Sequence, residues 1–272
     1  MTPQETIWCD GEFIPANTLT ISPFDLGLTV GWGVFETLVA YQGEVFCFAD
    51  HWYRAEASAG ELGIALPAME DIQQAIPELI QRNDLSDTRA RIRFTVTGGE
   101  NPLIGGDQMG KAIITAISQR APADHATLIM SQLVQSESVG LKVTSYAHHV
   151  AALRAAIAAG ADEAIVSNPR GELCECAMAN LFIVQSGEVH TPPLESGCLS
   201  GVTRAVVLAL CESLSIPAYE TILHEADLSS ADEIFITNTA REVQPASLLG
   251  NPMERGKITS QLQQAYQTLL IS

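Results

Sequence analysis

A lysine and a glutamate lie 33 residues apart, and their side chains could act together on a carbonyl compound. Lys142 precedes an alanine-rich segment, and Glu175 lies in the apolar run Leu-Cys-Glu-Cys. A lysine that loses its proton readily forms a Schiff base with a carbonyl. A buried carboxylate that faces a pyridine nitrogen keeps that nitrogen protonated, so the ring can accept electrons. The pair is therefore the minimum that a pyridoxal-phosphate enzyme requires.

Each of the two residues also has an ordinary structural explanation. A lone lysine before a helix is commonly a solvated charge. A structural salt bridge would satisfy Glu175 as well as a cofactor would. If 173–176 is a regular strand, Cys174 and Cys176 share one face and Glu175 points to the other. The two residues alone leave both interpretations open.

The order of several motifs around these residues resembles the class IV aminotransferases, which are fold type IV pyridoxal-phosphate enzymes. The central block contains GADEAIV, GELCECAMANLFIV and TPPLESGCLSGVTR. Looser matches are IWCDGEFIPA near the start, GWGVFETL at 31–38, FADHWYRAEASAGELGI at 48–64 and ITNTAREVQPA at 236–246. The resemblance spans nearly the whole chain. It implies two α+β domains with the active site in the cleft between them.

The resemblance also assigns roles to individual residues. Lys142 would be the catalytic Schiff-base lysine, and Glu175 would face the pyridine nitrogen. Each of the other matched positions is an ordinary helix, strand or cap residue when considered without the resemblance. The further cofactor contacts that it implies are Arg54, Tyr146, Asn180, Gly201, Val202, Thr203 and Thr239.

Gly201 opens the segment that would hold the phosphate of pyridoxal phosphate. A glycine allows the backbone to approach a ligand closely, and the first amides of a helix lack partners within the helix. The amides of Val202 and Thr203 would therefore suit an anion. An ordinary helix start capped by Ser200 explains the same residues.

The polar side chains of 89–97 include two arginines that share one face of an alternating strand. A guanidinium fork suits the carboxylate of a substrate. Solvated charges that balance an acidic protein explain the arginines equally well. The substrate contacts that the resemblance implies are Arg93, Arg91, Val30 and Ala240.

Three further residues bear on the reaction. Tyr146 favours an aminotransferase over aminodeoxychorismate lyase, and Gly98 stands where D-amino acid aminotransferases carry a carboxylate-binding arginine. The segment ECAMANLF and Asn238 resemble the lyase, which converts 4-amino-4-deoxychorismate to 4-aminobenzoate and pyruvate. We expect an aminotransferase that moves an amino group between an amino acid and a 2-oxo acid. The alternatives are the lyase and a non-catalytic cofactor-binding protein.

The composition restricts the partners of the chain. The 32 acidic and 14 basic residues give a formal charge of −18, which argues against a nucleic-acid surface. No apolar run approaches the ~20 residues of a membrane span, and the N-terminus lacks a signal-peptide layout. The six cysteines show neither a disulfide framework nor zinc spacing. We expect a cytoplasmic protein without a metal, and the resemblance implies a homodimer.

The domain division follows from composition and periodicity. Residues 1–119 form an N-terminal α+β domain, 120–126 a linker and 127–272 a C-terminal α+β domain that carries the lysine. We expect a helix with Asp50 as its N-cap that runs through about Leu62, with Gly63 past its end. A later helix contains Pro77, which predicts a kink or a late start. The run 233–239 is expected to be the last strand.

Overall fold

The structure is a computed structural model that describes residues 5–100, 110–134 and 140–270. The chain divides into a first unit, Met1–Ala121 with Leu141–Tyr146, and a second unit, Pro122–Gly140 with Ala147–Ser272. The lysine segment therefore belongs to the first unit, whereas composition and periodicity predict it in the C-terminal domain. The reason is backbone pairing. Phe35 N donates to Lys142 O at 3.0 Å, and Val34 forms an antiparallel bridge with Val143.

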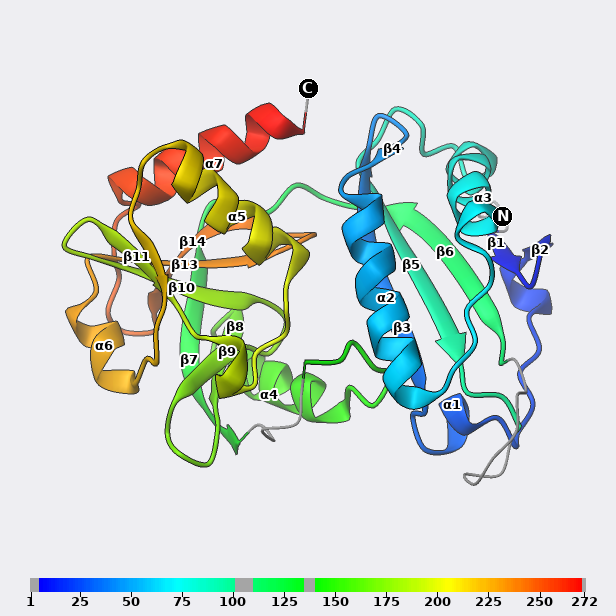
Figure 1. Ribbon diagram of the computed structural model, residues 1–272, viewed down its shortest axis with the longest axis horizontal. Coiled ribbons are helices and arrows are strands. Elements are labelled where there is room, and N and C mark those ends of the chain that lie inside the picture. The colour runs from blue at the N-terminus through cyan, green and yellow to red at the C-terminus, as the bar shows by residue number, and fades with distance from the viewer. Residues whose placement is uncertain (1–4, 101–109, 135–139, 271–272) are drawn as a thin grey trace. The chain divides into compact units, whose positions relative to one another are not determined.

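The first unit contains a six-stranded antiparallel sheet in the order β2-β1-β6-β5-β3-β4. The helices α2 and α3 cover one face of this sheet (Figure 1). Its strands are β1 Thr6–Cys9, β2 Glu12–Pro15, β3 Gly33–Tyr41, β4 Glu44–Val45, β5 Ala90–Thr97 and β6 Ala112–Ser118. Its helices are η1 Ala16–Thr18, α1 Leu26–Thr29, α2 Phe48–Leu62 and α3 Met69–Arg82.

The alternation predicted for β5 is observed. Ile92 and Phe94 are buried beneath the helices, while Arg91 and Arg93 are exposed on the opposite face. This alternation follows from the two-residue period of a strand. The face beneath the helices also contains Glu36, which pairs with Phe94 across the sheet. The core of the first unit thus contains a carboxylate among apolar side chains.

The predicted start of α2 was wrong and its predicted end is confirmed. The helix begins at Phe48, and its N-cap is Cys47 in the left-handed region, with φ 53°, instead of Asp50. It ends before Gly63, whose φ of 65° suits a residue without a Cβ. The helix α3 continues through Pro77 from Met69 to Arg82.

The second unit contains an eight-stranded mixed sheet in the order β12-β11-β10-β13-β14-β7-β8-β9. The helix α4 packs against β7 and β8, and α7 packs against β13, β14 and α5 (Figure 1). Its strands are β7 Ala126–Val134, β8 Glu163–Ser167, β9 Leu173–Cys176, β10 Asn180–Gln185, β11 Glu188–Thr191, β12 Ala218–Glu220, β13 Glu233–Asn238 and β14 Glu242–Leu248. Its helices are α4 Ala147–Ala158, η2 Leu194–Ser196, α5 Val202–Ser213, α6 Glu225–Ser230 and α7 Lys257–Leu269.

Two predictions about strands in the second unit were wrong. The strand β13 is followed by β14, in which Pro245 pairs with Phe235; a proline inside this run hides the strand signal. Cys174 and Cys176 pack in different apolar clusters, because the register of β8 and β9 shifts between Val166 and Ser167. Strict alternation does not survive such an irregularity.

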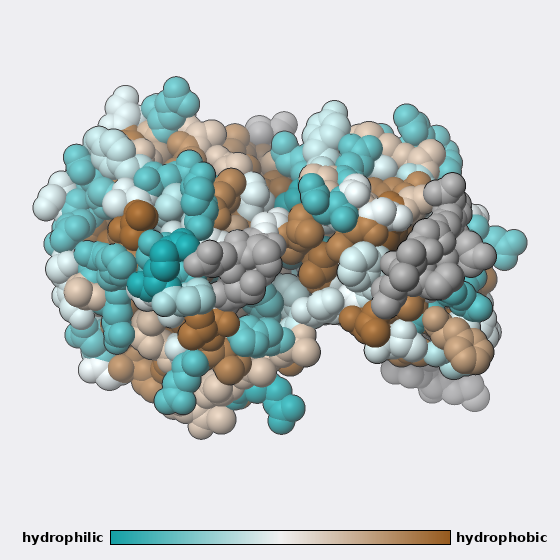
Figure 2. Space-filling view, turned by 60° about the horizontal axis from the view of Figure 1, so that its bottom comes forward, coloured by the Kyte–Doolittle hydropathy of each residue, from teal (hydrophilic) through white to brown (hydrophobic). Residues whose placement is uncertain are grey.

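Hydrophilic side chains cover much of the face shown in Figure 2, with hydrophobic side chains among them. Among the described residues, no helix combines the length and apolarity needed to cross a membrane. Several large apolar side chains around α1 are nevertheless exposed. They are Ile21 (37%), Phe24 (73%), Leu28 (64%), Val30 (56%) and Trp32 (38%).

Candidate active site

Lys142 is fixed by its backbone in the first unit. Its amide donates to Ser58 Oγ at 3.1 Å, and its carbonyl accepts from Phe35 N. Thr144 N then donates to Gly33 O at 2.8 Å, so the segment continues along the edge of β3. The side chain of Lys142 is long, but hydrogen bonds to β3 and to α2 hold the backbone from which it extends.

Aromatic rings surround the amine of Lys142. Its Nζ lies 4.6 Å from the ring centroid of Phe35 and 5.9 Å from that of Tyr146. The two rings meet edge to face, with their centroids 5.3 Å apart. The guanidinium carbon of Arg93 lies 3.8 Å from the centroid of Phe35. The Lys142 amine and the Arg93 guanidinium thus both lie near the Phe35 ring, and the quadrupole of such a ring attracts a cation.

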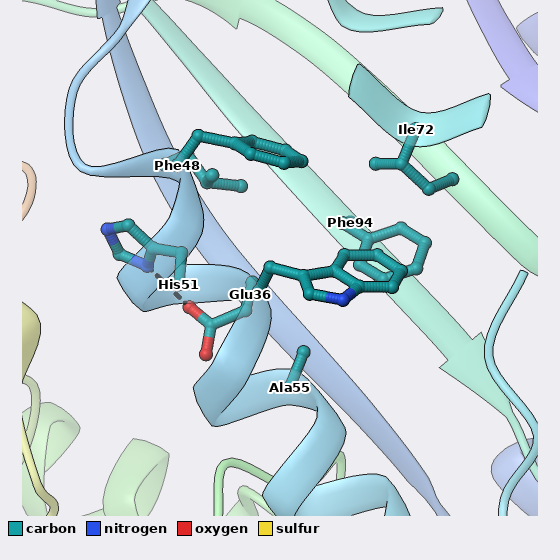
Figure 3. A pocket seen from close by; sticks show the side chains of 8 residues that line it. Glu36, Phe48, His51, Ala55, Ile72 and Phe94 are labelled. Atoms are coloured by element: carbon teal, nitrogen blue, oxygen red, sulfur yellow. Dashed lines mark hydrogen bonds and ion pairs between the residues drawn. The ribbon is translucent and has the colours of Figure 1, made fainter. Parts of the chain in front are cut away.

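Arg54, on α2, is held by a buried carboxylate. Its Nε donates to Glu36 Oε1 at 2.8 Å, and its Nη2 donates to Glu36 Oε2 at 2.7 Å. His51 Nδ1 lies 2.8 Å from the same Oε2. Figure 3 shows Glu36 and His51 pointing toward one another beside the apolar side chains of Phe48, Ile72 and Phe94.

The partners of Glu36 determine its charge. Burial raises its pKa, but the charge of Arg54 and the hydrogen bonds from Arg54 and His51 lower that pKa to about 2. Burial lowers the pKa of His51, and Glu36 opposes that shift. An ionised carboxylate can only accept hydrogen bonds, so Nδ1 of His51 is the donor.

In the second unit, three of the predicted residues meet. Glu175 Oε2 accepts hydrogen bonds from Leu199 N at 3.1 Å and from Asn180 Nδ2 at 3.4 Å. Asn180 Nδ2 also donates to Leu199 O at 2.9 Å. A Cβ added to Gly201 would lie 1.9 Å from Asn180 Oδ1. The backbone at 201 therefore packs closely against Asn180, and only glycine fits there.

The helix α5 begins at Val202, with Gly201 as its N-cap and without a side-chain cap hydrogen bond. Gly201, and not Ser200, thus occupies the N-cap position of α5. Val202 and Thr203 are buried. Their amides lie at the positive end of a 12-residue helix, where an anion is stabilised.

A second turn positions Thr239 and Ala240. Asn238 Oδ1 accepts from Ala240 N at 2.9 Å and from Arg241 N at 2.6 Å. Asn238 Nδ2 donates to Met178 O at 2.7 Å. Arg241 in turn donates to Gln244 and to Asp162 O. Asn238 thus holds the turn after β13 in shape, and hydrogen bonds to the carbonyl groups of Met178 and Asp162 attach the turn to the rest of the second unit.

Glu163, from the GADEAIV motif, is a further buried carboxylate of the second unit. Its side chain is 0% exposed, its Oε1 accepts from Ala164 N at 3.3 Å, and its Oε2 has no hydrogen-bond partner among the described residues. Arg241 Nη2 lies 3.6 Å from Oε2. Burial raises the pKa of Glu163 to about 7, the charge of Arg241 lowers it, and Glu175 raises it.

The remaining predicted positions fall in two places. Val30 follows α1 and is exposed, and Arg91 is exposed on β5. The structure brings Lys142 and Tyr146 together in the first unit. It brings Glu175, Asn180 and Gly201 together in the second. In the described part of the chain, no group of three or more His, Cys, Asp or Glu side chains could hold a metal ion.

The family profile described as amino-transferase class IV matches residues 33–249. The chain belongs to the class IV aminotransferases. It is 32% identical over 290 residues to a putative branched-chain-amino-acid aminotransferase of Methanocaldococcus jannaschii, with 97% of this chain and 96% of that protein covered. It is also 27% identical to a D-alanine aminotransferase of Listeria monocytogenes, with 94% and 93% covered. The family therefore favours amino transfer over the lyase reaction.

Solved structures agree with this membership. A branched-chain aminotransferase of Thermoproteus uzoniensis with norvaline superposes with a TM-score of 0.90 at 30% identity, covering 98% of this chain and 94% of that one. A branched-chain aminotransferase of T.th. with pyridoxamine 5'-phosphate gives 0.89 at 28% identity, with the same coverage of both chains. The aminotransferase thus has the two-sheet fold type IV architecture that the resemblance implied.

Sequence reasoning missed three residues of this aminotransferase: Phe35, Glu36 and His51. A signal was available for Glu36, which lies between Val34 and Leu38 on an otherwise apolar strand face. A single charged residue in such a pattern indicates a paired, buried carboxylate. Phe35 and His51 gave no such signal, because aromatic and histidine side chains are common in strands and helices.

Proposed function

We propose that this class IV aminotransferase uses pyridoxal 5'-phosphate, with Lys142 as the residue that binds it covalently. The observation that supports this most directly is the placement of Lys142. Its backbone is tied to β3 and α2, while its amine lies against the rings of Phe35 and Tyr146. A surface lysine without a function would not require this fixation. When bound, the cofactor supplies an electron sink for the charge left after proton removal.

Each unit offers groups that suit one part of the cofactor. The first unit contributes an amine, the hydroxyl of Tyr146 and the guanidinium of Arg54. The second unit contributes Glu175, which suits a protonated pyridine nitrogen, and the amides at the start of α5, which suit a phosphate. Thr239 and Ala240 contribute a second set of backbone and hydroxyl donors.

The chain's own residues then perform defined tasks. The amine of Lys142 removes the proton from the α-carbon of the substrate. The same amine later delivers a proton to a different carbon, which completes the transfer. Asn180 and Leu199 N donate to Glu175 and so stabilise its ionised form. Arg93, held over Phe35, is the proposed partner for a substrate carboxylate, with Arg91 beside it on β5.

Residue 98 bears on the stereochemistry of the substrate. A Cβ at Gly98 would lie 2.6 Å from Cδ1 of Trp32, whose Nε1 donates to Leu62 O. An arginine, which the resemblance places here in D-amino acid aminotransferases, would displace the Trp32 ring. We therefore propose L-amino acids with branched or other apolar side chains as donors. The names of several relatives give branched-chain amino acids, while others give D-alanine.

Substitution of the lysine tests the cofactor proposal. Lys142→Ala should abolish the visible absorbance of bound pyridoxal phosphate and lower turnover by at least about 1,000-fold, because both the covalent contact and the proton carrier are removed. Lys111→Ala is the matched control, since Lys111 forms an exposed ion pair with Asp10. An unchanged absorbance spectrum in Lys142→Ala would refute the assignment.

A panel of donors tests the substrate proposal. The full-length protein would be mixed with L-leucine, L-valine, D-alanine and 4-amino-4-deoxychorismate in separate reactions. Branched L-amino acids should yield the 2-oxo acid and the amine form of the cofactor. Faster conversion of D-alanine would overturn the proposed stereochemistry. Pyruvate released from 4-amino-4-deoxychorismate without the amine form would instead support the lyase.

We also propose that the protein is a homodimer. The exposed apolar side chains of 21–32 form a candidate contact region in the first unit, and such residues are frequent at subunit interfaces. Light scattering of the purified protein tests this proposal. Phe24→Glu should shift the mass toward that of one chain, and a monomeric wild type would rule the dimer out.

A further inference from the structure

Glu36 controls the side chain that we assign to the cofactor phosphate. It is 1% exposed, and both of its oxygens are engaged by Arg54 at 2.7 and 2.8 Å. His51 Nδ1 adds a third contact at 2.8 Å. Such a two-point pairing fixes the plane of a guanidinium as well as its position. A single-point contact would leave the group free to rotate.

The contacts also determine which edge of Arg54 faces Glu36. Nε and Nη2 lie on the same edge of the guanidinium, and both donate to the carboxylate. The opposite end, with Nη1, therefore points away from Glu36. His51 closes the other side of Oε2, so the carboxylate itself is held by a second residue of α2.

The charges of this group cancel. Glu36 is ionised and Arg54 is cationic, while burial favours the neutral form of His51. Arg54 therefore brings no net charge to a phosphate when it is considered together with its partners. The contribution of Arg54 to phosphate binding must therefore come from the direction of its hydrogen bonds.

We propose that Glu36 is a positioning residue for the cofactor phosphate: it orients Arg54 so that the guanidinium donates to the phosphate with a fixed geometry. This inference rests on the proposed function, because it assumes that Arg54 meets the phosphate. Glu36 itself touches neither the cofactor nor the substrate.

Glu36→Gln distinguishes orientation from charge. The substitution keeps the shape of the side chain and removes its negative charge. If Arg54 acted only through charge, the variant would bind a phosphate more tightly, since the neutralising carboxylate is gone. If orientation matters, binding weakens, because the amide group of glutamine places a donor against the donors of Arg54.

The test compares pyridoxal 5'-phosphate with pyridoxal, which lacks the phosphate. The dissociation constants of both compounds are measured on the full-length protein after removal and return of the cofactor. Glu36→Gln should weaken the phosphate compound by about tenfold to a hundredfold. It should change the binding of pyridoxal by no more than about twofold. Equal losses for both compounds, or tighter binding of the phosphate compound, would overturn the inference.

Four further variants complete the test. In Arg54→Gln, adding Glu36→Gln should cause no further loss for the phosphate compound, because the group to be oriented is already absent. Glu233→Gln is the matched control. Glu233 is also a buried carboxylate that accepts several hydrogen bonds, but it does so at the start of α7. If Glu36→Gln does not fold, Glu36→Asp keeps the charge and shortens the side chain, and it should show the same selectivity for the phosphate compound.

The failure of the proposed function gives a different result. A wild-type protein that binds neither compound with a saturable visible absorbance would refute the proposed function and this inference together. Tight wild-type binding with an unselective effect of Glu36→Gln would refute only the positioning role.

Discussion

Two buried glutamates, one in each unit, differ in whether their surroundings stabilise the ionised carboxylate. Glu36 accepts two hydrogen bonds from Arg54 and one from His51, and its pKa is lowered to about 2. Glu163 Oε1 accepts a long backbone hydrogen bond from Ala164 N, and its Oε2 lies 3.6 Å from Arg241. Burial raises its pKa to about 7, although the charge of Arg241 and backbone hydrogen bonds from Ala164 and Met178 lower it. Burial opposes the charged form in both cases. The charge of the neighbouring arginine and the hydrogen bonds to the carboxylate decide the result.

This contrast shows how buried charge is used in the aminotransferase. In the first unit, a satisfied carboxylate orients a guanidinium that we assign to the cofactor. In the second unit, a poorly satisfied carboxylate lies near Glu175, whose charge raises its pKa further. The two residues therefore contribute to stability with opposite dependence on pH.

Removal of the better satisfied carboxylate should have the largest effect. Glu36→Ala leaves Arg54 and His51 without their acceptor, so we expect a loss of about 3 to 5 kcal/mol in the free energy of unfolding at pH 7. Urea unfolding of the variant and the wild type measures this loss in the free energy of unfolding. Glu78→Gln, which breaks the exposed pair with Arg82, should change stability by less than about 0.5 kcal/mol. Equal effects of the two variants would remove the contrast.

The dependence of stability on pH below 4.5 shows whether ionised Glu36 stabilises the folded protein. Its folded pKa lies below the ordinary value of 4.5, so its stabilisation is present above that value and is lost as the pH falls toward 2. The stability difference between wild type and Glu36→Ala should therefore shrink over this range.

Neutralising Glu163 should have an intermediate effect of opposite sign. Its folded pKa is raised from 4.5 to about 7, so the wild type loses stability as the pH rises between these values. Glu163→Gln removes this loss and should be more stable than wild type at pH 8 by roughly 1 to 3 kcal/mol. Near pH 4 the gain should vanish. A gain that did not depend on pH would show that ionisation is not the cause.

The cation near Glu163 should have the smallest effect. Arg241→Met removes the group that lowers the pKa of Glu163, so the pH-dependent loss should extend to higher pH. The change in stability at pH 7 should be below about 1 kcal/mol, because Arg241 is partly exposed. Combining Arg241→Met with Glu163→Gln should leave no pH dependence from this pair. A remaining slope would point to another group.

Local signals in the sequence predicted much of the fold. The dipeptides Gln42-Gly43 and Ser186-Gly187 each contain the glycine that a two-residue hairpin turn favours, and both residues of each turn have positive φ in the structure. Gly63 ends α2 as predicted. The start of α2 was misplaced because Asp50 offers a cap in sequence, whereas Cys47 occupies the boundary in the structure.

Long-range pairing was not predictable from the same signals. The strand β14 contains Pro245, and its place between β13 and β7 depends on residues far along the chain. The separate environments of Cys174 and Cys176 depend on a register shift with β8. Within the site, Glu175, Asn180 and Gly201 lie together, and their roles toward the cofactor are those that we propose. The Glu36 contacts with Arg54 and His51 required the packing of α2 on β3.

The path of the chain between the units limits how the protein can be divided. The chain leaves the first unit after Ala121, returns for Leu141–Tyr146, and leaves again at Ala147. A gene fragment for residues 1–121 would encode the sheet without its lysine, and a fragment for 122–272 would encode the lysine without the strand that anchors it. Exchange of single domains between homologues, or a genetic split at residue 121, would therefore separate the amine from its support. A split after residue 146 would keep the lysine with β3, but it would remove β7 from the sheet of the second unit.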